Sequence, residues 1–297
     1  MDSQAASRFI LENARPLERA IYRWYFENGT KQAVVGELGK FQNPDGGFGH
    51  GLEADNWNPN SNPVATNDAI ITLHRIGALG DADDIVNGIV RYLRSHDSFD
   101  EGQRRWLFAI ETNKEYPHAI WWEKNGDGLM GYNPTVSLAA FMICFGGRTS
   151  YYEEILRDAF AYLSEKTDVG GDELKCYLLC YELLRENRIT DLLDLAELRQ
   201  LLGERLENAI CKDSKKYGVE YVPTPSDFFT DPRPEFMSEG IRALIEAEQG
   251  ILANIQKDDG GFDISWQWYT PYPEFEQARQ WWRAKITIDR MLFARNA

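Results

Sequence analysis

The sequence predicts an all-α protein in which helical hairpins stand in a ring. Apolar residues recur with a period of about 3.6 along the whole chain, and no stretch alternates for long enough to predict a sheet. Short turns alternate with long loops, as expected if each hairpin places its tight turn at one end and its loops at the other. A motif that occurs near both ends of the chain, in the same register, also favours a stacked or circular arrangement.

An opening helical segment and a series of longer helices account for most of the chain. Thr30 and Asp191 are the expected N-caps, because their side-chain oxygens can accept from the free amides of a first turn. Pro16 and Pro273 suit a first turn, where the missing donor of proline is not needed. The expected helices are Ser7–Asn13, Pro16–Asn28, Lys31–Gln42, Val64–Ile76, Asp81–His96, Thr135–Phe145, Tyr151–Lys166, Asp172–Asn187, Asp191–Cys211, Phe236–Gln256 and Pro273–Ala294.

The connections between these helices are of two kinds. Tight turns at Gly77–Gly80 and Gly146–Ser150 predict antiparallel neighbours. The other loops are long and rich in Trp, Tyr and Phe, so we expect them to carry function rather than to be disordered. No linker divides the chain, and a single domain over residues 1–297 is predicted. The long loops are Asn43–Pro63, Asp97–Pro134, Lys212–Glu235 and Lys257–Tyr272.

The chain is acidic, with 32 Lys and Arg residues against 47 Asp and Glu and a net charge of −15. This charge repels phosphate backbones, so nucleic acid is not an expected partner. The sequence has no signal-peptide pattern and no apolar run of about eighteen residues, which predicts a cytoplasmic protein without a membrane span. Its four cysteines lie in apolar helical patterns, as free thiols do in a reducing compartment. Nothing in the sequence indicates an oligomeric state.

The repeated motif joins a helix end to a glycine turn. In both copies a glycine, an apolar residue and a glutamine lead to Asp-Gly-Gly-Phe, and every position is offset equally. The Gln can satisfy orphan carbonyls at a helix end, Asp-Gly-Gly supplies a turn with positive φ, and the Phe fills the gap between hairpins. A third, degenerate copy without the Gln lies at Asn125–Tyr132. The two full copies are Gly36, Leu38, Gln42 and Asp45–Phe48, and Gly250, Leu252, Gln256 and Asp259–Phe262.

This pattern resembles the QW motif of triterpene cyclases and the related repeats of protein prenyltransferase β subunits, two families of the terpenoid cyclase and prenyltransferase superfamily. Both families are α/α toroids, in which an outer ring of helices encloses an inner ring. The resemblance therefore implies an α/α toroid here. Phe48 and Phe262 stand where those families usually have Trp. The shared residues are structural, so the resemblance concerns architecture rather than catalytic residues.

Asp81-Ala82-Asp83-Asp84 matches the Asp-x-Asp-Asp tetrad with which class II terpene cyclases protonate their substrates. In those enzymes the tetrad opens an inner helix, whereas here it follows the Gly77–Gly80 turn and starts the next, outer helix. Acids are favoured at any helix start, so we interpret the tetrad as capping. A prenyltransferase zinc site is not predicted, because no cysteine has an aspartate two residues before it. Neither a metal nor a cofactor is expected.

Three carboxylates could face a central cavity: Glu53 and Asp55 after the first repeat, and Asp68 at the start of the next helix. A cyclase acid must stay protonated near neutral pH, and burial among apolar groups can achieve this by raising its pKa. Asp68 precedes Ala69-Ile70-Ile71 and is the best placed of the three. The alternative is that Asp68 is an ordinary first-turn carboxylate and that the other two lie on the loop surface.

Indole rings collect in the long loops, which is the strongest functional signal in the sequence. Such rings can stabilise a carbocation by cation–π attraction, stack on sugar rings, or pack between hairpins without any ligand. The expected substrate-binding residues in and beside these loops are His50, Trp57, His118, Trp121, Trp122, Glu123, Trp266 and Trp268.

Three functions remain open from the sequence. The first is an enzyme that cyclises or isomerises an isoprenoid, a bulky and partly apolar small molecule, by protonation from an acid such as Asp68. The second is a glycosidase or polysaccharide lyase on an α/α barrel, with Glu53, Asp55 and Glu123 as carboxylates whose separation would set the stereochemistry. The third is a binding toroid without catalytic activity.

Overall fold

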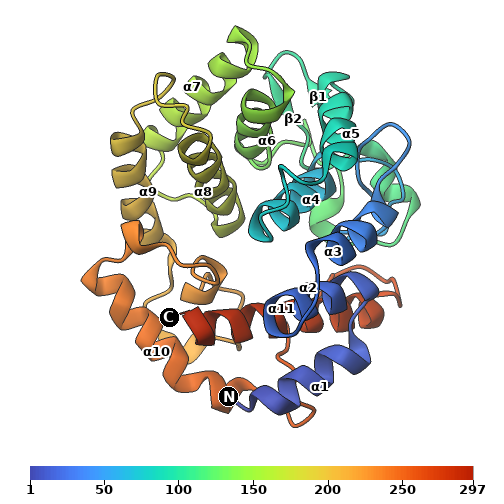
Figure 1. The fold of residues 1–297 in the computed structure, drawn as a ribbon, viewed down its shortest axis with the longest axis vertical. Coiled ribbons are helices and arrows are strands. Elements are labelled where there is room, and N and C mark those ends of the chain that lie inside the picture. The colour runs from blue at the N-terminus through green and yellow to red at the C-terminus, as the bar shows by residue number, and fades with distance from the viewer. Residues whose placement is uncertain (297) are drawn as a thin grey trace. The chain divides into compact units, whose positions relative to one another are not determined.

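Helices make up most of the structure, a computed structural model that describes residues 1–296 (Figure 1). This confirms the all-α prediction. The helices are α1 (Ser3–Asn13), α2 (Pro16–Phe26), α3 (Lys31–Leu38), α4 (Pro63–Arg75), α5 (Asp83–Arg94), α6 (Thr135–Phe141), α7 (Ser150–Glu165), α8 (Gly171–Glu186), α9 (Leu195–Ala209), α10 (Glu239–Ile255) and α11 (Phe275–Asn296). No helix of the described residues is long and apolar enough to cross a membrane.

Several helix ends differ from the prediction: α1 begins at Ser3 rather than Ser7, α10 at Glu239 rather than Phe236, and α11 at Phe275 rather than Pro273. Thr30 caps α3 as predicted, since its hydroxyl accepts from an amide of the first turn at 3.2 Å. The N-cap prediction for Asp191 is wrong. Its two oxygens accept from Arg148 at 2.8 and 2.9 Å, and Asp194 instead accepts from the first amides of α9. Both aspartates precede the same apolar pattern, so the local sequence does not show which one caps α9. The long-range ion pair with Arg148 occupies Asp191 and leaves Asp194 as the cap.

A short hairpin interrupts the loop between α5 and α6. Strand β1 (Phe99–Asp100) pairs antiparallel with β2 (Arg105–Trp106). The Phe99 and Trp106 rings lie opposite each other in an edge-to-face contact with centroids 4.9 Å apart. Strands of two residues are too short to show alternation, which explains why the sequence does not reveal them.

The chain forms two compact units, and each is described by itself. Unit 1 combines the segment up to Lys40 with the segment from Ile210 onward, and unit 2 is Phe41–Ala209. In unit 1, α1 packs on α11 and α2, and α10 packs on two 3-10 helices of the preceding loop. Phe9, Ile10 and Leu292 belong to its buried core, so segments from both ends of the chain share one core.

In unit 2, helix α6 packs on α7 and α8, and α8 packs on α9. A buried hydrogen-bonded chain also joins α4, α6 and α8. The Ser137 hydroxyl donates to Asn67 Oδ1 at 2.6 Å, and Asn67 Nδ2 donates to Cys176 Sγ at 3.7 Å. Burial raises the pKa of the Cys176 thiol to about 12, so it stays protonated and donates to Asn133 Oδ1 at 3.4 Å.

The first repeat fastens its glycine turn to α5. Gln42 Nε2 donates to the Gly46 carbonyl at 3.0 Å and to a carbonyl in the first turn of α5 at 3.1 Å. Gly46 has a φ of +100°, and a Cβ there would lie 2.0 Å from the Gly88 carbonyl oxygen, so both the turn and the close approach need glycine. The Phe48 amide donates to the Thr66 hydroxyl of α4 at 3.1 Å.

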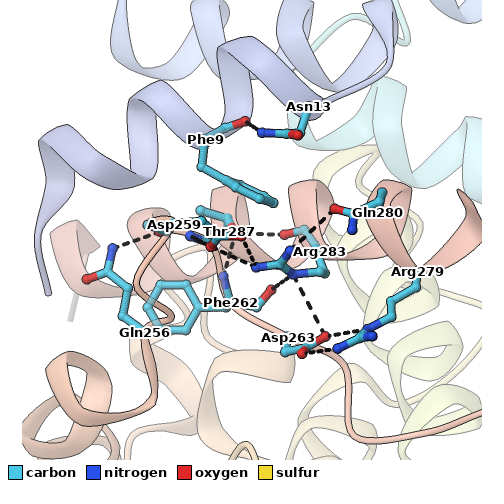
Figure 2. A network of polar contacts seen from close by, with 12 residues as sticks. Phe9, Asn13, Gln256, Asp259, Phe262, Asp263, Arg279, Gln280, Arg283 and Thr287 are labelled. Atoms are coloured by element: carbon cyan, nitrogen blue, oxygen red, sulfur yellow. Dashed lines mark hydrogen bonds and ion pairs between the residues drawn. The ribbon is translucent and has the colours of Figure 1, made fainter. Parts of the chain in front are cut away.

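The second repeat has the same geometry within unit 1, with α1 in place of α5. Gln256 Nε2 donates to the Gly260 carbonyl at 2.8 Å and to the Asp2 carbonyl at 2.9 Å. Gly260 has a φ of +92°, and a Cβ there would lie 2.3 Å from a carbonyl oxygen of α1. The Phe262 amide donates to the Thr287 hydroxyl of α11 at 3.0 Å (Figure 2).

An ion-pair network surrounds the second repeat (Figure 2). Arg283 Nη2 donates to both oxygens of Asp259 at 2.8 Å, and Arg279 Nε donates to Asp263 at 3.0 Å. Burial by itself would raise the pKa of each aspartate, but the hydrogen bonds and charges of the arginines, together with a backbone hydrogen bond to each carboxylate, outweigh it and hold both pKa values below the usual range. In the first repeat the corresponding Asp45 accepts from the Ser61 hydroxyl instead, at 2.7 Å.

Two more loop amides are bound by side chains of a following helix in the same way. The Trp106 amide donates to the Thr135 hydroxyl at 2.9 Å, and the Tyr132 amide donates to Glu173 Oε1 at 2.6 Å. Tyr132 closes the degenerate third copy, where Asp127 accepts from an amide two residues on, as Asp45 does in the first copy. This amide contact recurs even where the glutamine of the motif is missing.

Candidate functional site

An alternating run of asparagines shapes the loop after the first repeat. Asn56, Asn58, Asn60 and Asn62 occupy every second position. The Asn56 side chain accepts from the Asn58 amide at 3.2 Å, and the Asn58 side chain accepts from the Asn60 amide at 3.0 Å. Asn62 caps α4. The side chains of Asn56, Asn58 and Asn62 therefore each fix backbone two or three residues ahead, which gives this loop one defined path.

This loop pairs with the loop before α6. The backbone of Asn56 forms an isolated antiparallel bridge with that of His118. Two flanking backbone hydrogen bonds of 3.0 and 2.9 Å join residues 55–57 to residues 117–119. Segments far apart in the sequence are thus held side by side in unit 2.

Buried asparagine side chains also join the asparagine loop to the loop before α6. Asn58 Nδ2 donates to Asn113 Oδ1 at 2.9 Å and to the Thr112 hydroxyl at 2.8 Å. Asn56 Nδ2 also donates to Asn113 Oδ1, at 3.2 Å, and Asn113 Nδ2 donates to the Trp122 carbonyl at 2.9 Å. All three asparagines are buried. A buried network with its hydrogen bonds made is rigid, so it fixes the positions of Thr112 and Asn60 at its edge.

A polar cleft of about 700 Å³ opens beside this network, within unit 2. Eight of its twelve lining residues carry a carboxylate, amide or hydroxyl group, one is a lysine and three are apolar. This volume lies within the range of small-molecule sites, about 300–1,000 Å³. The lining residues are Asn43, Pro44, Asp45, Asn60, Ser61, Asp97, Ser98, Leu107, Ile110, Glu111, Thr112 and Lys124.

Several lining side chains are fixed on one side and keep hydrogen-bonding capacity on the other. Asp45 Oδ1 accepts from the Gly47 amide at 2.9 Å and from the Ser61 hydroxyl at 2.7 Å, which leaves Oδ2. Asn60 Nδ2 donates to Asn58 at 2.9 Å, which leaves the side-chain carbonyl. Thr112 accepts from Asn58 and keeps its own proton to donate. The wall therefore offers both donors and acceptors in fixed positions.

The cleft is acidic. The hydrogen bond from Lys114 to Glu111, at 2.7 Å, holds the pKa of Glu111 below its usual range, so this carboxylate is ionised at neutral pH.

Burial, together with the charge of Asp97, raises the pKa of the Tyr92 phenol, which therefore stays protonated. Its hydroxyl is shielded from solvent and makes no hydrogen bond of normal geometry with the described residues. Among residues 1–296, no cluster of three or more His, Cys, Asp or Glu side chains could hold a metal ion.

The structure brings several of the residues predicted from the sequence to the bridge beside the cleft. Asp55 and His118 lie there and are buried, and Trp57 is half-buried. His118 Nδ1 lies 2.6 Å from the Tyr116 carbonyl, which can only accept, so Nδ1 carries the proton. The expectation that these residues bind substrate stays a prediction, because other side chains line the cleft.

The neighbouring aromatic residues differ in exposure. Trp122 is buried and stacks on Phe108, with centroids 4.6 Å apart and an interplanar angle of 10°. Trp121 is half-buried, and Glu123 is exposed. Trp122 therefore packs between loop segments.

The remaining predicted residues of unit 2 lie at both ends of the asparagine loop. His50 is exposed, and its Nε2 lies 2.8 Å from Oδ1 of Asn43, a cleft residue. Glu53 accepts from the Asp55 amide at 3.2 Å. Asp68 is half-buried in the first turns of α4, with Oδ2 shielded from solvent.

Trp266 and Trp268 lie in unit 1, so nothing places them beside the residues of unit 2. Trp268 is fully buried against Phe275, with centroids 6.0 Å apart. The aspartate tetrad has its charged members exposed at the start of α5, as the capping interpretation expects, although the N-cap residue is Ala82 and its side chain makes no cap.

None of the site residues predicted from the sequence lines the cleft, and the lining residues Asn60, Thr112 and Lys124 were not predicted. One signal could have found the first, since four asparagines at every second position are unusual in a loop and indicate an extended segment with repeated side-chain turns. No local pattern marks Thr112 or Lys124, whose place at the cleft depends on the other loop.

Comparisons with known proteins leave the site to be interpreted from its geometry alone. No family model, no curated protein and no solved structure matches this chain.

Proposed function

We propose that this protein binds a carbohydrate, or a closely related hydroxyl-rich small molecule, in the cleft of unit 2. The observation that carries this proposal is the set of lining residues, of which eight carry a carboxylate, amide or hydroxyl group and three, Pro44, Leu107 and Ile110, are apolar. Sugar hydroxyls both donate and accept, so they match such a wall, while the C–H groups of a sugar ring pack on the apolar side chains.

The same wall disfavours a hydrocarbon ligand. Covering a polar side chain without replacing its hydrogen bonds to water costs about 1–3 kcal/mol, and most of the lining residues are polar. A ligand that brings hydrogen-bonding groups of its own avoids this cost.

Preorganisation of the wall supports binding of a small polar ligand. The side chains of Asn43, Asp45 and Asn60 are already held by hydrogen bonds inside the protein. A side chain that is fixed before binding loses little conformational entropy when the ligand arrives, a saving of about 0.5–1.5 kcal/mol for each.

We also propose that the chain forms an α/α toroid and belongs to the terpenoid cyclase and prenyltransferase superfamily. The support for this is that the glutamine of each repeat donates to a backbone carbonyl at a helix start, which belongs to α5 for the first repeat and to α1 for the second. If the helices form a closed ring, the last repeat must contact the first helix, and the second repeat does contact α1. A crystal structure or small-angle scattering would test this closure.

Isoprenoid cyclisation with Asp68 as the acid is the second candidate. The observation that favours it is the shielded Oδ2 of this carboxylate at the start of α4, because a proton donor needs such protection from water. The two candidates differ in the ligand that they require.

Calorimetric titration distinguishes the carbohydrate proposal from the isoprenoid proposal. We expect saturable binding of a neutral oligosaccharide such as cellohexaose or maltohexaose, and none of farnesol. Asn60→Ala and Thr112→Val should each weaken binding about tenfold, because a lost hydrogen bond to ligand is worth about 1–1.5 kcal/mol. Asn125→Ala, in the same loop as Thr112 but outside the cleft, is the matched control. Binding of farnesol that depends on Asp68, with no response to the sugars, would replace the carbohydrate proposal by the isoprenoid one.

A further inference from the structure

The hydroxyl of Tyr92, on α5, is a buried polar group that the fold does not use. Tyr92 is 1% exposed, and its hydroxyl makes no hydrogen bond of normal geometry with the described residues. Burying a hydroxyl without a partner destabilises a protein, and most buried polar groups in folded proteins have one. Such a group beside a cleft is a reason to expect that a ligand supplies the partner.

This hydroxyl lies at the wall of the cleft in unit 2. Burial is the main cause of the raised pKa of Tyr92, the charges of the lining residues Asp97 and Asp45 add to it, and Ser98, a third lining residue, is close enough to oppose it. The ring packs against the glycine turn that follows Asp45, since a Cβ at Gly47 would lie 2.8 Å from Tyr92 Cδ2. The ring is therefore held behind the wall, with its hydroxyl beside two carboxylates.

These two carboxylates have no cationic partner among the described residues. Asp45 accepts only through Oδ1 and Asp97 only through Oδ2, in each case from neutral groups, and neither forms an ion pair with another of residues 1–296. Arg91 donates to the backbone carbonyl of Asp45, at 3.2 Å, rather than to its carboxylate. The third lining carboxylate, Glu111, is different, because it is paired with Lys114 at 2.7 Å. The negative charge of the cleft that lacks a partner is thus at Asp45 and Asp97.

We propose that Asp45, Asp97 and Tyr92 bind the ammonium group of an amino sugar, such as a β-1,4-linked glucosamine oligomer. This inference rests on the proposed carbohydrate function of the cleft and names the class of sugar. An ammonium group has three N–H donors, and the wall offers three acceptors for them: Asp45 Oδ2, Asp97 Oδ1 and the hydroxyl oxygen of Tyr92. Rotation of the half-buried Ser98 side chain opens the Tyr92 hydroxyl to the ligand.

Charge and hydrogen bonding distinguish this ligand from others that a polar cleft could hold. A neutral sugar hydroxyl has one donor and leaves both carboxylates without a counter-charge, whereas acidic sugars and phosphates are repelled by them. A linear polyamine such as spermidine carries ammonium groups but no hydroxyls, so it leaves Asn60 and Thr112 elsewhere on the wall without partners. An amino sugar supplies both kinds of group.

Calorimetric titration with three β-1,4-linked hexamers tests the inference, because the sugars differ only in the group at carbon 2. Cellohexaose carries a hydroxyl there, the N-acetylglucosamine hexamer a neutral amide, and the glucosamine hexamer an amine that is largely protonated at about pH 6. At that pH the glucosamine hexamer should bind at least about fivefold more tightly than either neutral hexamer, because hydrogen bonds between charged groups are the stronger ones.

Variants locate this preference at the proposed site. Asp97→Asn should reduce it to about twofold or less, because one of the two charges is lost. Glu115→Gln removes the same charge from an exposed position of the loop before α6, outside the cleft, and should keep the preference. This control separates binding at the cleft from general attraction to an acidic chain.

Tyr92→Phe gives a readout that a structural role would not move. The change keeps the ring and removes the hydroxyl without a partner, so the midpoint of thermal unfolding should hold or rise while the preference for the glucosamine hexamer falls.

The inference is overturned if cellohexaose binds and the glucosamine hexamer binds no more tightly, or if spermidine binds as tightly as the glucosamine hexamer. It is also overturned if Glu115→Gln lowers the preference as much as Asp97→Asn does, or if Tyr92→Phe leaves it unchanged. If none of the sugars binds, the carbohydrate function itself fails.

Discussion

Gln256 and Asp2 form a reciprocal pair. The side-chain amide of Gln256 donates to the Asp2 carbonyl at 2.9 Å, and its oxygen accepts from the Asp2 amide at 2.7 Å. Gln256 thereby holds Asp2, the N-cap of α1, whose carboxylate accepts from the first amides of that helix. In the first repeat Gln42 binds only a carbonyl of Ile85 on α5, so the contact with α1 is the more complete one.

Replacing Gln256 should therefore destabilise the protein through the start of the chain. Gln256→Ala removes hydrogen bonds to Asp2 and Gly260, and we expect the free energy of unfolding to fall by about 1–3 kcal/mol. Urea denaturation measures this. Gln277→Ala, at an exposed position of α11, is the control and should change stability by less than about 0.5 kcal/mol. Equal effects of both changes would mean that the pair with Asp2 is not a stabilising contact.

Two glycines of the second repeat, Gly250 and Gly260, should respond oppositely to alanine. At Gly260 a Cβ would meet a carbonyl oxygen of α1 at 2.3 Å with φ at +92°, so Gly260→Ala should destabilise by about 3 kcal/mol or more. Gly250 has no atom within 4 Å of an added Cβ inside α10, so Gly250→Ala should stabilise by about 0.5–1 kcal/mol. Thermal unfolding of both variants checks the sign. A stable Gly260→Ala protein would contradict the close approach of the turn to α1.

Thr66 and Thr72 offer a matched pair on α4. Both hydroxyls donate to the carbonyl one turn earlier, at 2.8 and 2.9 Å, but only Thr66 also accepts from the Phe48 amide. Thr66→Val leaves that buried amide unsatisfied, so we expect a loss of about 1–3 kcal/mol in the free energy of unfolding. Thr72→Val should lose much less. Amide hydrogen exchange at Phe48 gives an independent reading, since exchange should accelerate in Thr66→Val alone.

The titration of Glu173 should make the free energy of unfolding depend on pH. Burial raises its pKa, although the hydrogen bond from the Tyr132 amide and the charge of Arg105 oppose the shift. The folded protein therefore keeps this proton to a higher pH than the unfolded chain, whose glutamates titrate near about 4.3. Stability from this group is complete below that pH and declines as the pH rises through the folded pKa.

Glu173→Gln removes this titration and keeps an oxygen for the Tyr132 amide. The variant should match the natural protein near about pH 4 and be more stable than it at about pH 7. Urea denaturation of both proteins across this range measures the difference. Parallel curves would show that Glu173 does not titrate differently in the folded state.

The helices were predictable because a helix is a local pattern. Pro16 begins α2 and Thr30 caps α3, as expected from signals carried by the residues themselves. Where a local signal failed, a distant residue was the cause. Asp191 looks like a cap in the sequence, but Arg148 holds its carboxylate in an ion pair. Strands β1 and β2 were not predicted for a different reason. Each has only two residues, which are too few to show an alternating pattern.

The candidate site was only partly visible in the sequence. The sequence marked Asp55 and His118 as functional candidates, and the structure joins their segments through the bridge at Asn56. It could not show that Thr112 would lie against Asn58, because a loop of mixed polar residues has no period that fixes which side chains meet.

By itself, the sequence determined the helices and the two glycine turns, because the helical period and the positive φ of glycine act over a few neighbouring residues. The tertiary structure alone decided that α1 receives the second repeat and α5 the first, and that two distant loops enclose a polar cleft. These contacts join residues far apart in the chain, and their free energy depends on backbone positions that no local pattern specifies.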